Sequence, residues 1–77
     1  MRDTLLEVEI DRFESFRRHR CVEVVKWLRV SGDYRRVITE TYCYDTDTLW
    51  KPTCRAATKA DMRAAAEKLN QFVRMRP

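Results

Sequence analysis

Glycine is nearly absent from this sequence, and Gly32 is the single one in 77 residues. Loops that hold phosphate groups need several glycines, because a side chain would keep the backbone amides away from the anion. The sequence therefore has no nucleotide-binding loop of this kind. Histidine is equally scarce, and no residue suited to orient it lies near His19, so a thiolate–imidazole pair with Cys21 or Cys43 is not expected. We expect no catalytic residues and no enzymatic activity.

The three cysteines, Cys21, Cys43 and Cys54, form an odd set and lack the close spacing of zinc ligands. An odd number in a short chain also argues against a disulfide framework, so we expect a reducing compartment. Asp45 and Asp47 could contact a cation, but alternating Asp and Thr residues are typical of turns that hydrogen-bond to their own backbone. We therefore expect no metal site and no cofactor.

Long hydrophobic runs are missing as well, and acidic residues occur within the first ten positions. We expect neither a signal peptide nor a membrane-spanning helix, and hence a soluble, cytoplasmic protein with no membrane partner. Hydrophobic residues make up 44% of the chain, which indicates a folded protein, and its length suffices for one small domain over residues 1–77. The net charge of +4 favours anionic partners mildly.

Three segments have the pattern of β-strands. Residues 6–10 alternate between apolar and acidic side chains, as in a strand with one buried face. Residues 21–30 and 34–44 are rich in β-branched and aromatic side chains, and the break at 31–33 contains glycine, which predicts a hairpin. Residues 13–20 lose the alternation, so we expect a turn or a wide hairpin loop there.

A helix is the alternative for the region before Gly32. Its apolar residues would share one helical face: Phe13, Phe16, Cys21, Val24 and Leu28. The valines of this segment disfavour the helix, because β-branched side chains lose rotamer freedom there. The hairpin is therefore the favoured interpretation.

The acidic residues of the first predicted strand, Glu7, Glu9 and Asp11, are expected to lie on an exposed, solvated face. Basic residues of a neighbouring strand would then be their cross-strand partners: Lys26, Arg29 or Arg35. This stripe is expected to remain ionised and to do no acid–base chemistry.

The last third of the chain predicts a turn, a short strand and a helix. Residues 45–48 are polar, and residues 49–57 suit a fourth strand that Pro52 confines to a sheet edge. Thr58 and Asp61 resemble a capping box, and apolar residues follow at helical spacing: Met62, Ala65, Ala66, Leu69, Phe72 and Val73. The predicted fold is α+β, a three- to four-stranded antiparallel β-meander with one C-terminal amphipathic helix packed on one face.

The second predicted strand is apolar on both faces. One face carries Val22, Val24, Leu28 and Val30, and the other carries Cys21, Val25 and Trp27. One helix covers only one face of a sheet, so the other face would keep an apolar and aromatic patch of the kind that marks interfaces. A protein partner, or a second copy in a homodimer, would cover it.

Arginines and aromatic residues are interleaved on the predicted sheet, as in proteins that stack bases and neutralise phosphates. In many small domains the same residue types simply form a core and a solvated surface. The candidate partner-binding residues are Trp27, Tyr34, Arg36, Tyr42, Tyr44, Arg17 and Arg18. We expect the aromatic residues to matter most for a protein partner and the arginines for nucleic acid.

These features favour a non-enzymatic binding protein that occupies a surface of a protein or nucleoprotein partner. In size and sheet-plus-helix layout the chain resembles small phage-encoded inhibitors of host machinery, the anti-CRISPR proteins among them. That resemblance rests on general architecture and transfers no residues.

The alternative is direct nucleic-acid binding, by a single-strand reader or by a sheet. Three strands followed by a helix with alanines at 64–66 are similar to the AP2-like arm-binding domains of integrases, which place the sheet in the major groove. Those domains have glycine-punctuated strands, whereas here Gly32 stands alone. The acidic residues of the first strand would also repel phosphate.

Overall fold

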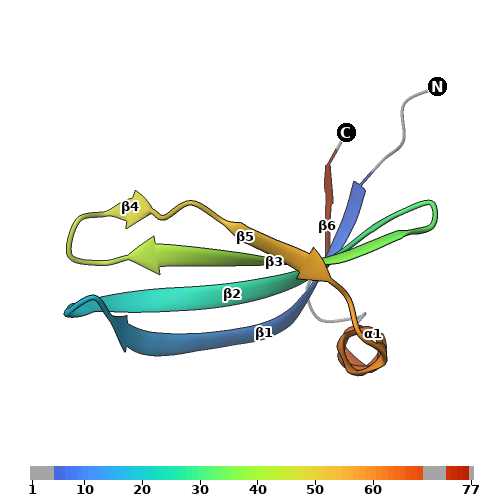
Figure 1. The fold of residues 1–77 in the computed structure, drawn as a ribbon, viewed down its shortest axis with the longest axis horizontal. Coiled ribbons are helices and arrows are strands. Elements are labelled where there is room, and N and C mark those ends of the chain that lie inside the picture. Colours follow the sequence, from blue (N-terminus) through green and yellow to red (C-terminus); the bar gives the residue numbers. More distant parts are fainter. Residues whose placement is uncertain (1–4, 69–72, 77) are drawn as a thin grey trace.

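The computed structural model describes residues 5–68 and 73–76. Along the chain its elements are β1 (Leu5–Arg17), β2 (Arg20–Ser31), β3 (Tyr34–Cys43), β4 (Thr48–Leu49), β5 (Thr53–Ala56), α1 (Lys59–Glu67) and β6 (Val73–Arg76). The strands form one antiparallel, curled sheet in the order β4-β3-β2-β1-β6, and β5 also pairs with β3 (Figure 1). The α+β class and the β1–β2–β3 meander are confirmed. The sheet has more strands than the three or four expected.

β1 and β2 form one long hairpin that pairs from Leu6 opposite Val30 to Arg17 opposite Arg20. A turn does lie within residues 13–20, as expected, but it is a tight one at Arg18 and His19, and the wide loop is wrong because the flanking residues belong to the strands. The helical alternative for this region is also wrong. The two turn residues, Arg18 and His19, have φ angles of 53° and 60°. A two-residue turn with both φ values positive matches the twist of paired strands. The sequence gives no signal for this turn, because neither residue is the Gly, Asn or Asp that usually occupies such a turn.

A β-bulge bends the β1–β2 hairpin near its middle. Glu9 lies opposite Trp27 and Asp11 opposite Lys26, which leaves Ile10 without a cross-strand partner in the register. An extra residue of this kind increases the local twist of a sheet. β6 pairs with β1 only on the N-terminal side of the bulge, at residues 5–8 (Figure 1).

α1 begins with the capping box expected from the sequence. The amide of Asp61 donates to Thr58 Oγ1 at 3.2 Å, and the amide of Thr58 donates to Asp61 Oδ2 at 2.8 Å. Arg55 also donates to Asp61, at 2.6 Å. This hydrogen bond and those from Thr58 outweigh the effect of burial and hold the pKa of Asp61 well below its usual value.

The helix is shorter than predicted and is not the last element. It ends at Glu67, and Val73 belongs to β6 instead of extending the helical face. The expected helical positions of Leu69 and Phe72 lie outside the described residues. The prediction failed at Val73 because the helical spacing of apolar residues continues across this segment, whereas its pairing with β1 joins residues far apart in sequence.

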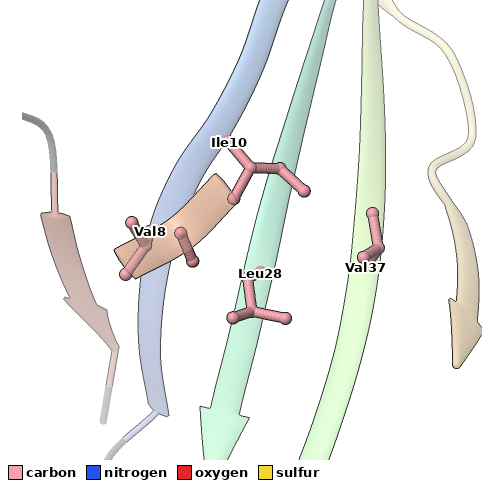
Figure 2. Packing of buried hydrophobic residues seen from close by; sticks show 5 residues of the cluster. Val8, Ile10, Leu28 and Val37 are labelled. Atoms are coloured by element: carbon pink, nitrogen blue, oxygen red, sulfur yellow. The ribbon is translucent and has the colours of Figure 1, made fainter. Parts of the chain in front are cut away.

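The helix packs on one face of the sheet, where Ala65 meets Val8, Ile10, Leu28 and Val37 (Figure 2). A second buried cluster lies on this face farther along the strands, and consists of Val22, Val24 and Cys43 with Phe13 and Trp50 against them. We call this side of the sheet the helix face and the opposite side the open face. In a strand, neighbouring residues point to opposite sides, so Trp27 lies on the open face.

The fourth-strand region is divided in two. β4 pairs with β3 at Tyr42 and Cys43, and β5 pairs with β3 farther along, at residues 36–39. Pro52 falls between the two short strands, so it interrupts no ladder. The prediction that this region lies at a sheet edge is confirmed.

Candidate binding surfaces

Trp27 lies at the centre of the open face and is only 3% exposed, although α1 is on the other side of the sheet. The guanidinium carbon of Arg74 lies 3.6 Å from the centre of its ring system. Its indole nitrogen donates to Glu40 Oε1 at 3.0 Å, and Glu40 Oε2 accepts from Arg74 at 3.1 Å. The second apolar face of β2 is therefore covered in part by charged side chains of the same chain, where the sequence predicted an open patch.

Glu7 lies under the same arginine and is completely buried. Its carboxylate accepts from Arg29 at 2.8 Å and from Arg74 at 2.6 Å. Burial by itself would raise the pKa of Glu7, but the two arginines outweigh it and lower the pKa. The expectation that Glu7 is solvated is thus wrong, because β6 brings Arg74 over it. Arg29 is confirmed as its cross-strand partner.

A second ion-pair network lies on the open face and spans the bulge. Arg12 donates to Glu9 and to Glu23, each at 2.7 Å. The hydrogen bond with Glu9, reinforced by the negative charge of both carboxylates, raises the pKa of Arg12 despite some desolvation. The hydroxyl of Tyr44 donates to the other oxygen of Glu23 at 3.5 Å. Desolvation together with the charge of Glu23 raises the pKa of Tyr44.

A groove with a volume of about 330 Å³ separates the two networks. Its apolar lining comes from Val25, Trp27, Tyr42 and Leu49, and the charged groups around it belong to the networks described above. Leu49 is 69% exposed. Each charged group of this lining has an oppositely charged partner. We call this hollow the open-face groove.

The structure divides the predicted partner-binding residues among three places. Trp27 and Tyr42 line the open-face groove, and the ring of Tyr44 meets that of Tyr42 edge-on at 5.5 Å. Tyr34 and Arg36 contact each other at the β2–β3 end of the sheet, with the guanidinium 5.5 Å from the ring centre. Arg17 and Arg18 lie at the β1–β2 turn.

The two turns occupy opposite ends of β2, a strand of 12 residues, and lie at opposite ends of the long axis in Figure 1. At about 3.3 Å per residue, the separation is about 36 Å. The predicted residues therefore do not make one continuous surface.

A second hollow, of about 300 Å³, lies on the helix face near the β1–β2 turn. Its cationic lining consists of Arg17, Arg18 and Lys51. Its remaining lining is Trp50 with three threonines, Thr39, Thr41 and Thr53. The guanidinium carbon of Arg18 lies 4.9 Å from the centre of the Trp50 ring. We call this hollow the basic cleft.

Sequence reasoning missed most of the lining of both hollows. In the open-face groove it missed Leu49 and the charged residues of the lining, and in the basic cleft it missed Trp50, Lys51 and the threonines. Alternation along β3 places Thr39 and Thr41 on one face and Glu40 and Tyr42 on the other. The sequence could therefore have predicted that the threonines and these two residues belong to different surfaces. The positions of Leu49 and Lys51 depend on the path between β4 and β5, which carries no such pattern.

Within residues 5–68 and 73–76 there is no group of three or more His, Cys, Asp or Glu residues that could hold a metal ion. The cysteines are free thiols, with Cys43 buried and the other two exposed. No helix in the described part of the chain is long and apolar enough to cross a membrane. Comparison of the sequence with protein-family models and curated proteins, and of the structure with solved structures, gave no match.

Proposed function

We propose that this protein is a non-enzymatic binding protein that docks one protein partner, alone or within a nucleoprotein complex, on its open face. The partner inserts an apolar or aromatic side chain into the open-face groove. The observation that carries this proposal is the groove itself, which combines an apolar lining with charged groups that are already paired with one another.

The chemistry of the lining favours a protein side chain over a phosphate group. Glu23 and Glu40 would repel a phosphate, and Arg12 and Arg74 already bind carboxylates. An apolar side chain needs no new charge partner, and it gains free energy by leaving water for the surfaces of Trp27 and its neighbours. A central aromatic anchor with a polar rim is also the usual anatomy of a protein interface.

The finer form of the proposal is an inhibitor of host machinery of the phage type, such as an anti-CRISPR protein. Such a protein acts by covering a surface of its target, and a groove that holds one anchoring side chain suits that mode. Its support is the chain's size and its sheet-plus-helix layout. A homodimer would use the same groove, and the test below distinguishes it.

The test compares Leu49→Asp with Met62→Asp. Both side chains are exposed apolar groups, at 69% and 39%, but Leu49 lines the groove whereas Met62 lies on α1. Each tagged variant is used to capture partners from a nuclease-treated lysate of the source cell, and captured proteins are quantified by mass spectrometry. We expect the wild type and Met62→Asp to capture one partner at a stoichiometric amount. The amount that Leu49→Asp captures should be at least tenfold lower.

Three outcomes would contradict the proposal: equal capture by both variants, capture abolished by nuclease, or equal loss in both. Analytical sedimentation of the purified protein measures its oligomeric state and so tests whether the groove holds a second copy of the chain. If the wild type is a dimer that Leu49→Asp converts to a monomer, the occupant of the groove is a second copy of this chain and the proposed hetero-partner is wrong.

A further inference from the structure

We infer that the basic cleft binds single-stranded nucleic acid, with a backbone phosphate held by Arg17, Arg18 and Lys51 and a base against Trp50. The cleft lies on the helix face, so this inference is independent of the partner proposed for the open face. Two parts of the chain supply the cations: the end of β1 and the turn after it carry Arg17 and Arg18, and the connection between β4 and β5 carries the lysine.

The cations of the basic cleft lie together in one hollow and, among the described residues, have no acidic partner, a property they share with Arg20, Arg35, Arg36 and Arg63. Arg12, Arg29, Arg55 and Arg74 each form an ion pair with a carboxylate. Among the described residues, no carboxylate lies within ion-pair distance of Arg17, Arg18 or Lys51. Like charges brought together without compensation repel each other, and a bound anion relieves that repulsion.

The rest of the lining is suited to a phosphate. It contains no acidic residue, and its three threonines carry hydroxyl groups that can donate to phosphate oxygens. Alternation along β3 keeps Glu40 on the open face, where it binds Trp27, and places Thr39 and Thr41 on the cleft side. The sheet therefore separates the Glu40 carboxylate from the cleft.

The backbone holds the aromatic part of the cleft in place. The amide of Trp50 donates to the carbonyl of Thr41 at 2.8 Å, which fixes the start of the β4–β5 connection against β3. Arg18 sits in a tight turn at a φ of 53° and lies over the Trp50 ring. A base that displaces this guanidinium gains the indole as a stacking surface, and the released guanidinium can then pair with the phosphate.

A single strand fits these features better than a duplex. A hollow of about 300 Å³ admits one nucleotide-sized group but not a double helix. Stacking on Trp50 also requires an unpaired base, which a duplex does not present.

The experiment measures binding of a fluorescently labelled oligothymidylate of about ten nucleotides by anisotropy, a length within the site sizes of single-strand binders. The test variant is Arg18→Gln/Lys51→Gln, and the matched control is Lys59→Gln/Arg63→Gln, which removes the same charge from exposed positions on α1. We expect the test variant to bind at least tenfold more weakly than the wild type and the control to bind within about twofold. The slope of log affinity against log salt should fall by about 1.4 in the test variant, since each phosphate contact on a single strand contributes about 0.7.

Four results would overturn the inference. They are no binding by the wild type at low salt, equal loss in both double variants, a duplex of the same length bound as tightly as the single strand, and inorganic phosphate or a mononucleotide bound as tightly as the oligomer. The last result would mean that the cleft recognises free phosphate. A Trp50→Leu variant adds a separate readout, because it should weaken the oligomer and leave the salt slope unchanged.

Discussion

At the scale of single residues, the main feature is a buried carboxylate between two arginines. Glu7 has no exposed surface, whereas Arg29 and Arg74 are each about a quarter exposed. Removing one partner of a buried ion pair is costly because the remaining charges lose their compensation. Glu9 provides a matched comparison two residues away on the same strand, since its partner Arg12 is 43% exposed.

We predict that Glu7→Gln lowers the free energy of unfolding by about 3 kcal/mol, whereas Glu9→Gln lowers it by less than about 1 kcal/mol. The measurement is urea unfolding followed by tryptophan fluorescence at neutral pH. If the two variants are destabilised equally, the Glu7 network contributes no more than a surface pair does.

The same residue gives the protein part of its acid sensitivity. The folded state holds the pKa of Glu7 below its ordinary value of 4.5, so this contribution is complete above that pH and is lost as the pH falls through the lower folded value. The difference in stability between the wild type and Glu7→Gln should therefore shrink as the pH falls below 4.5.

At the scale of elements, the β1–β2 turn contains avoidable strain. His19 adopts a φ of 60°, in the left-handed region that costs a residue with a side chain about 1 kcal/mol relative to glycine. We predict that His19→Gly raises the free energy of unfolding, because it removes this strain of about 1 kcal/mol. The greater flexibility of glycine in the unfolded chain offsets part of the gain. Thermal unfolding followed by circular dichroism measures the change.

Gly32 is the control for this turn prediction, because it has a φ of 58° and no atom within 4 Å of an added Cβ. Gly32→Ala should therefore destabilise the protein through backbone strain alone, by an amount similar to the gain at position 19. If Gly32→Ala leaves the free energy of unfolding unchanged, a left-handed backbone does not strain a residue with a side chain in these turns, and the prediction for His19 loses its basis.

At the scale of the whole molecule, β2 is the centre of the sheet. It pairs with β1 on one side and β3 on the other along nearly its full length, and it contributes Val22 and Val24 to the buried interior. β4 and β6 are short strands at the two edges. Amides that are paired on both sides and buried open only in larger unfolding events.

We predict that hydrogen exchange is slowest at the amides of β2 and at those of β3 that pair with it, and at least tenfold faster at the amides of β4 and β6. Exchange followed by two-dimensional NMR measures this order. Equal protection in β6 and β2 would mean that the Glu7–Arg74 contact makes the edge strand part of the global unfolding unit.

The local pattern of the sequence predicted the elements whose signals are local. The β2–β3 hairpin follows from two β-branched segments around Gly32, and the start of α1 follows from the Thr58–Asp61 capping box. The two-sided apolar character of β2 also follows from alternation, with Val25 and Trp27 buried on one side and Val24 and Leu28 on the other. These features depend on residues a few positions apart, so no knowledge of the fold is needed.

Tertiary structure alone decided the features that join distant residues. Only the pairing of β6 with β1 brings Arg74 onto Trp27 and Glu7, and it thereby covers part of the open face. Arg74 and Glu7 are 67 positions apart in the sequence. Likewise, only the path from β4 to β5 brings Lys51 and Trp50 to Arg17 and Arg18. Such contacts are selected by the burial and charge compensation of the complete sheet, and these energies do not exist in any short segment of the chain.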